Sequence, residues 1–265
     1  MEDFLPPGHT GTNFRPFVVE LERVCIERLA ALRILVSSFR DGSALERIAP
    51  DPWPDQSIQF ELNFRNDPSV SIIRNAHFDA FTGITRGFVE FLDAGMAMIR
   101  LTEANEPLSE TSDDPTDIAS AFYHGIFQES LAIGRDKRWS SPAKTATFKL
   151  MTDQQIQVAR EIFELRATIE HHHAVPKSEM RLTLVRLTSN PTVGAPGLDS
   201  SWSTFVEPGE GYGPVLHLEP WIVTFPAGER IDLGPHHIEG LSLVVMEYLV
   251  RFAWGSVHAS IMGAV

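Results

Sequence analysis

The chain has 265 residues, of which 43% are hydrophobic and 22% charged, and its formal net charge is −13. This composition is typical of a folded soluble protein and excludes a chain that is disordered throughout. The acidic balance disfavours a broad nucleic-acid footprint and an anionic membrane surface as partners.

Hydrophobic periodicity predicts a long amphipathic helix over residues 16–40. Cys25, the single cysteine of the chain, falls on its apolar face. No internal disulfide can form, so we expect a reducing compartment and a cytoplasmic protein. A buried thiol on the apolar face of a helix is expected to be inert and structural.

A clean alternation of apolar and polar side chains predicts a strand at 58–65, with one buried and one exposed face. A second long helix is predicted over 73–101, and it contains Gly83, Gly87 and Gly95. Each glycine costs a helix about 1 kcal/mol relative to alanine. Three of them in one helix predict either close approach of a neighbouring element or a break in the helix.

The acidic, turn-rich stretch 103–114 is the best candidate for a subdivision of the chain; without it, residues 1–265 are expected to form a single globular domain. Asp114 and Pro115 then provide a cap and a first helical residue. Further elements follow from the same patterns: helices at 115–133, 152–170 and 239–262, and strands at 145–150, 179–188, 215–218, 222–225 and 230–233.

These elements predict an α+β fold, in which several long amphipathic helices pack on a small, mostly antiparallel sheet. The strands of that sheet come largely from the last third of the chain. The sequence contains no P-loop, no Gly-x-Gly-x-x-Gly, no Gly-x-Ser-x-Gly and no Cys-x-x-Cys. The sequence therefore disfavours P-loop nucleotide hydrolysis, Rossmann cofactor binding, α/β-hydrolase chemistry and cysteine-based zinc sites.

A cluster of histidines and carboxylates in the C-terminal region is the first candidate site. His217 and Glu219 share one face of a predicted strand, and His236, His237 and Glu239 follow about one hairpin later. Two histidines and a carboxylate can bind a divalent transition metal, either non-haem iron or zinc with an open position. The gap between the histidines is shorter than in cupins and iron oxygenases. The alternative interpretation is a set of turn or surface histidines.

The terminal helix carries a second candidate, a polar stripe of Glu247, Arg251, Trp254 and His258. The stripe interrupts the most apolar stretch of the chain, which favours a buried helix over a membrane span. The spacing of Arg251 and His258 resembles the Arg-x(4–6)-His motif of HEPN ribonucleases, over this helix alone. Phe252 stands where those families usually carry a polar residue. That resemblance implies RNA cleavage by the arginine and the histidine.

The third candidate is an aromatic loop region over 198–225, with Trp202, Phe205, Tyr212 and Trp221. Aromatic side chains provide large contact area at a low entropy cost and are typical of binding surfaces.

Two functions from different classes remain open. The first is a soluble, non-catalytic binding or assembly subunit that uses helical faces and the 198–225 region, with a protein partner or a second copy of itself. The second is a metal-dependent enzyme, a hydrolase or an iron oxygenase. A HEPN-like ribonuclease is a remote third.

Overall fold

The computed structural model describes residues 15–40, 68–103, 115–136, 140–188 and 217–261. In chain order, its elements are α1 (Arg15–Arg40), α3 (Pro68–Glu103), α4 (Pro115–Arg135), α5 (Ser141–Thr145), α6 (Asp153–His171), β1 (Met180–Thr188), β2 (His217–Phe225), α7 (Pro235–Leu243), the π-helical segment η2 (Val244–Val250) and α8 (Arg251–Ile261). Among the described residues, the fold is therefore mostly helical with one small sheet.

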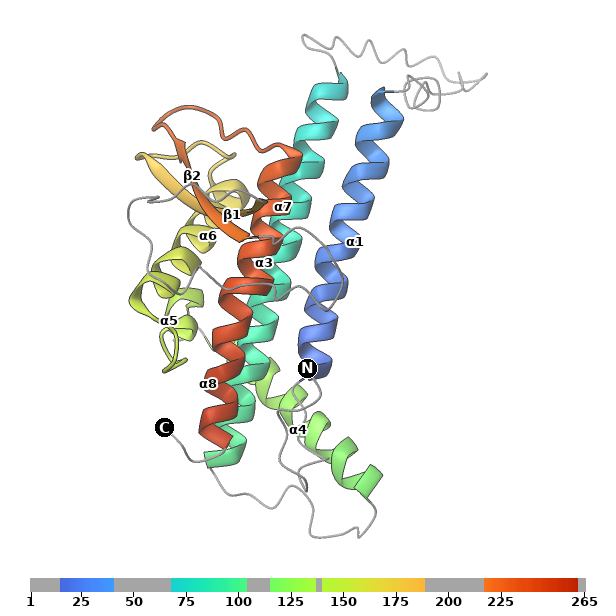
Figure 1. Ribbon diagram of the computed structural model, residues 1–265, viewed down its shortest axis with the longest axis vertical. Coiled ribbons are helices and arrows are strands. Elements are labelled where there is room, and N and C mark those ends of the chain that lie inside the picture. The colour runs from blue at the N-terminus through green and yellow to red at the C-terminus, as the bar shows by residue number, and fades with distance from the viewer. Residues whose placement is uncertain (1–14, 41–67, 104–114, 137–139, 189–216, 262–265) are drawn as a thin grey trace, which may run out of the picture.

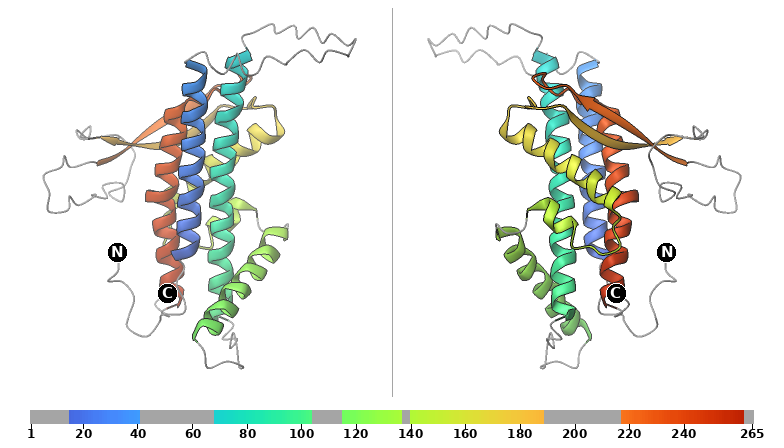
Figure 2. Two further views of the ribbon diagram at one scale, coloured as in Figure 1. Left: turned by 90° about the vertical axis from the view of Figure 1, so that its right-hand side faces the viewer. Right: turned by 90° about the vertical axis from the view of Figure 1, so that its left-hand side faces the viewer.

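Three long helical rods lie side by side: α1, α3, and the continuous helix formed by α7, η2 and α8 (Figure 1). α4 packs against the last turns of α3, where Arg100 Nη1 contacts Glu129 Oε1 at 2.8 Å. α5, α6 and the two strands lie on the side of the rods away from α1 in Figure 1, and Figure 2 shows the same order from two further directions. α1 is thus an outer helix of the described fold.

The hydrophobic core is centred on α3, because α1, α6 and α8 all pack against it. Phe81, Ile84, Phe88 and Leu92 are fully buried one turn after another along this helix. Phe88 stacks on Phe163 of α6, with ring centroids 5.8 Å apart. Such a continuous apolar stripe explains the strong helical periodicity of the sequence.

The glycines of α3 lie where neighbouring elements come closest, as their cost in a helix predicts. A Cβ on Gly87 would lie 3.1 Å from Leu21 Cδ1 of α1, and one on Gly95 would lie 3.0 Å from Cε1 of Phe148. Both distances are shorter than an ordinary van der Waals contact. The absence of a side chain at Gly87 therefore lets α1 approach the core.

The two strands pair antiparallel, with Leu184 opposite Trp221. The expected α+β class is confirmed at this level: long helices accompany a small antiparallel sheet, and its two described strands come from the last third of the chain. The strand predicted at 58–65 lies outside the described residues. The finer expectation, that the long helices pack mainly on the sheet, is only partly met, since α3 packs mostly against other helices.

β2 is one continuous strand, whereas two short strands on either side of Pro220 were predicted. The backbone N–H of Thr183 donates to Glu161 Oε2 at 2.9 Å, so it points away from its partner Ile222. Pairs with outward-pointing backbone nitrogens alternate along the two strands with hydrogen-bonded pairs, so the next outward-pointing pair is Val185 with Pro220. At such positions in an antiparallel pair the backbone nitrogens face outwards, so a proline removes no bond between the strands.

Four other predictions needed correction. The helix predicted at 73–101 begins at Pro68, five residues earlier, with a proline at its first position. Residues 145–150 form the end of a short helix and turns, not a strand, and no strand forms at 230–233. The terminal helix begins at Pro235, four residues earlier than predicted, because a proline at the first helical position is favourable. His236 and His237 therefore lie in its first turn.

The middle of this terminal helix is π-helical over Val244–Val250. π-helical hydrogen bonds join residues five apart, so the segment interrupts the α-helical periodicity of the rod. By length and composition alone, the rod from 235 to 260 could cross a membrane, with a mean hydropathy of 1.2. About two thirds of its most apolar stretch, 65%, is buried inside the molecule, as in core helices of soluble proteins.

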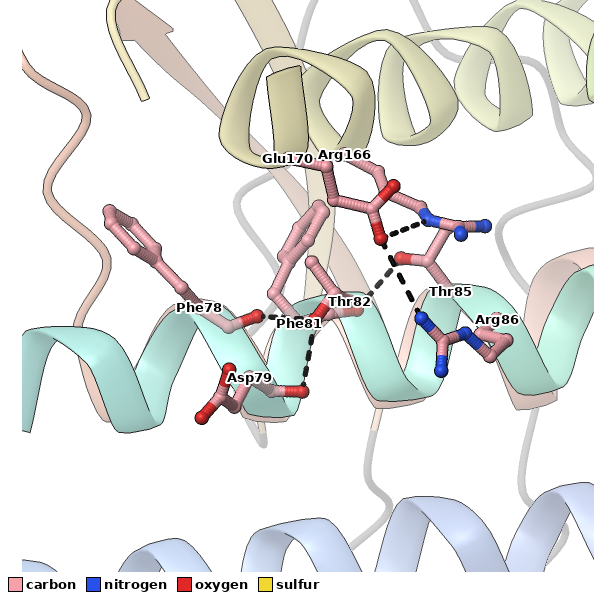
Figure 3. Close-up of polar contacts among 8 residues, drawn as sticks. All are labelled: Phe78, Asp79, Phe81, Thr82, Thr85, Arg86, Arg166 and Glu170. Carbon is pink, nitrogen blue, oxygen red and sulfur yellow. Dashed lines mark hydrogen bonds and ion pairs between the residues drawn. The ribbon is translucent and has the colours of Figure 1, made fainter. Parts of the chain in front are cut away.

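α6 is held against α3 by a polar junction at its C-terminal end (Figure 3). Glu170 Oε1 accepts from Arg166 Nε at 3.1 Å and lies 3.9 Å from Arg86 Nη2. The hydroxyls of Thr82 and Thr85 donate to carbonyls of their own helix. The polar groups of this junction are therefore bonded to each other or to the backbone of their own helix.

Candidate functional site

A groove lies between α1, the α7–η2 rod and the end of the sheet. Its volume is about 670 Å³. Its apolar lining includes Ile26, Leu29, Val185, Trp221, Leu243 and Met246. We call this cavity the α1 groove. Such a mixture of an apolar floor and a few charged groups is typical of binding sites.

The rim of the α1 groove is charged. Arg33 Nη2 lies 2.7 Å from Glu239 Oε1, so these two charges offset each other. Arg186 in turn pairs with the buried Glu219. Among the described side chains, Glu22 has no ion-pair partner, and Glu247 has none either. The rim is therefore net negative.

Cys25 lines the floor of the α1 groove but is only 3% exposed. Burial raises the pKa of its thiol to about 12, against which a hydrogen bond with Ser242 acts more weakly. The reactive form of cysteine is the thiolate. This environment agrees with the prediction that the Cys25 thiol is inert and structural, because a buried thiol with a raised pKa is not activated as a nucleophile.

Three aromatic rings meet at one end of the α1 groove. The indole of Trp221 lies 5.6 Å from the imidazole of His236 and 5.3 Å from that of His237, measured between ring centroids, and the two imidazoles are 4.3 Å apart. The backbone N–H of Gly234 donates to His237 Nδ1 at 2.7 Å. His237, the third residue of α7, thus caps the first turn of that helix.

The capping bond requires an unprotonated His237 Nδ1. Burial, reinforced by the neighbouring His236, lowers the pKa of His237 to about 4. Behind the pair, His77 is 3% exposed, and neither of its ring nitrogens has a hydrogen-bond partner among the described residues. Burial lowers the pKa of His77 as well. Burial therefore favours the neutral imidazole at both His237 and His77.

The residues of the predicted metal cluster are divided among separate contacts. Glu219 Oε2 accepts from Arg186 Nε at 2.9 Å, and Glu239 pairs with Arg33. No group of three His, Cys, Asp or Glu side chains within the described ranges is arranged to hold a metal ion. The backbone of His217 is described as the first residue of β2 but its side chain is not, so a site that includes it stays a prediction.

The predicted polar stripe spans the change from π-helix to α-helix. Glu247, on η2, is exposed and lines the α1 groove, whereas Trp254 and His258, on α8, are half-buried. Arg251 begins α8, and its side chain is not described. The stripe was predicted from α-helical spacing, which η2 interrupts.

Of the predicted aromatic region, Trp202, Phe205 and Tyr212 lie outside the described residues. Trp221 lies on β2, where it is half-buried against the two histidines. The described end of the 198–225 region is therefore a strand, and its aromatic side chain forms a wall of the α1 groove.

A buried ion pair on the other side of α3 was not predicted. Lys144 Nζ lies 2.5 Å from Asp93 Oδ1, and these side chains are only 5% and 10% exposed. Burial, opposed by the contact with Lys144, raises the pKa of Asp93. The signal that was available is the position of Asp93 inside the apolar run of α3; its partner, 51 residues away, left no signal.

No protein family model, curated protein or solved structure matches this chain.

Proposed function

We propose that this chain is a non-catalytic binding or assembly subunit whose partner docks on α1 and in the α1 groove. The observation that supports it most is the outer face of α1. Val19, Ile26 and Ile34 are 49%, 58% and 69% exposed. With Ala30 between them, these residues form one stripe, which we call the α1 stripe.

The opposite face of α1 is also apolar, since Leu21, Cys25 and Leu32 are buried against the core. A helix that is apolar on two faces normally has both faces covered. Exposed apolar surface that is continuous with a groove is typical of protein interaction sites. The α1 stripe and the α1 groove meet at Ile26, which belongs to both.

The polar groups of the α1 groove favour binding over catalysis. Its thiol has a raised pKa, and two of its arginines are engaged in ion pairs. A partner suited to this surface is a polypeptide that presents apolar side chains and at least one basic group, because the unpaired rim charges, Glu22 and Glu247, are negative.

The native mass of the full chain in an extract of its source cells tests this function. We expect the wild type to elute well above its own 29.6 kDa. Ile26→Glu should shift it to the mass of the free chain, because a buried, unpaired charge in an interface costs several kcal/mol. Leu150→Glu is the matched control: Leu150 is 45% exposed, lies away from α1, and should leave the mass unchanged.

The proposed function fails if the wild type elutes as a free chain, or if the two variants behave alike. A free chain that also carries stoichiometric iron, zinc or manganese would favour the metal-dependent enzyme instead.

A further inference from the structure

We propose that the partner on this surface is a second copy of the chain, with the two α1 helices packed antiparallel along the α1 stripe. This inference rests on the proposed function and names its partner. Interfaces between identical chains are most often two-fold symmetric, so that the same surface serves both copies.

The α1 stripe has the length and position that a helix pair needs. Val19 and Ile34 are fifteen residues apart, which is about 22 Å along an α-helix. All four residues of the stripe lie on the side of α1 opposite the buried Leu21 and Cys25. No described element covers that side, as Figures 1 and 2 show.

In an antiparallel arrangement, the apolar residues of the α1 stripe in one copy contact those of the other copy. With the two-fold axis beside residues 27 and 28, Val19 lies within about 3 Å, along the helix axis, of the level of Ile34 of the second copy. Ile26 lies opposite Ala30 of the second copy, and the small alanine allows the larger isoleucine to pack between the helices. Two equivalent sets of these contacts form, one on each side of the axis.

The charges beside the α1 stripe favour the same arrangement. Glu22 and Arg33 lie on the same flank of α1, which faces the α1 groove. In the antiparallel pair, Glu22 of each copy lies opposite Arg33 of the other. A parallel pair would place glutamate beside glutamate and arginine beside arginine, which is unfavourable.

Arg33 is able to make this contact. Its side chain is 71% exposed, and its partner Glu239 is 45% exposed. An exposed ion pair is weak, so Arg33 can lie between Glu239 and Glu22 of the second copy. Arg23 lies on the same face of α1, between Val19 and Ile26, and its guanidinium is held by Glu20 and Glu27 of its own helix.

The purified full chain, alone in solution, tests the inference by its mass in sedimentation or light scattering. The wild type should have twice the mass of 29.6 kDa. Ile26→Glu should be monomeric with an unchanged melting temperature, because Ile26 is exposed in the free chain. Leu150→Glu should remain a dimer.

Charge reversal provides a second test that does not remove apolar contacts. Glu22→Arg alone and Arg33→Glu alone should each weaken the dimer by at least about tenfold, because each brings like charges together. The double variant and a mixture of the two single variants should both regain the affinity.

Each contrary outcome has a distinct meaning. If the wild type is a dimer and the Ile26→Glu, Glu22→Arg and Arg33→Glu variants dimerise equally well, the inference is overturned, because the dimer then uses another surface. A purified wild-type monomer also overturns it. If that monomer still forms the Ile26-dependent complex in cell extract, the proposed function survives with a different partner; without such a complex, both fail.

Discussion

Replacing Asp93 by alanine should lower the free energy of unfolding by about 3–5 kcal/mol. The reason lies in its partner: the Lys144 side chain is 5% exposed, and its ammonium lies 2.5 Å from the carboxylate. Without Asp93, the lysine would stay buried with no counter-charge. Chemical denaturation of the wild type and the variant measures the difference directly.

Two further variants separate a buried charge from the loss of an ion pair as such. The double replacement Asp93→Leu with Lys144→Met should recover most of the loss, since apolar side chains can replace a buried ion pair at little cost. Glu27→Ala, which removes an exposed ion-pair partner of Arg23, should cost far less. The explanation is wrong if Asp93→Ala is no more destabilising than Glu27→Ala.

Stability should also fall as the pH is lowered from about 6.5 to about 4. Burial lowers the pKa of His237 to about 4 in the folded chain, from about 6.5 for an exposed histidine. Between these pH values, the unfolded chain binds a proton that the folded chain does not, so the free energy of unfolding decreases towards acid. The loss from His237 amounts to about 2–3 kcal/mol by pH 4.5. His77, whose pKa is also lowered, contributes in the same direction.

His237→Gln isolates this contribution. Glutamine at the third helical position can accept the Gly234 N–H, as His237 Nδ1 does, and it does not titrate. We expect the variant to lose less stability than the wild type between pH 7 and pH 4.5, with Asp232, His236 and His77 still present around it. His172→Gln, which replaces an exposed histidine outside the Gly234 cap, is the matched control. Equal pH profiles of wild type and His237→Gln would show that the cap does not exclude the proton.

The helices were predictable from local physics. The predicted boundaries at 16–40 and 152–170 fall within one residue of α1 and α6, because each has a strong apolar periodicity. A capping box of Thr152 and Gln155 begins α6: the Thr152 N–H donates to Gln155 Oε1 at 2.8 Å. Apolar periodicity and helix capping involve residues only a few positions apart, so both can be read from the sequence alone.

The rest depended on contacts between distant segments. Pro220 separates two strands by local rules, but the pairing of β2 with β1 leaves its nitrogen facing outwards. The π-helical segment Val244–Val250 was not predicted, because its residues follow the same apolar pattern as the rest of the rod. The ion pair of Asp93 with Lys144 and the stacking of Trp221 on His237 join elements that only the tertiary fold brings together. The sequence therefore pointed to several of the candidate residues, but it did not show which residues they contact.

The most direct test of the central claim, that α1 is a docking surface for a polypeptide, is site-specific photo-crosslinking in the source cells. A photo-reactive amino acid replaces Ile26 in the full chain, and in the control it replaces Leu150. We expect a light-dependent adduct with one polypeptide from position 26, and none from position 150. The absence of any polypeptide adduct at position 26, in cells that contain the folded chain, would contradict a binding role for α1.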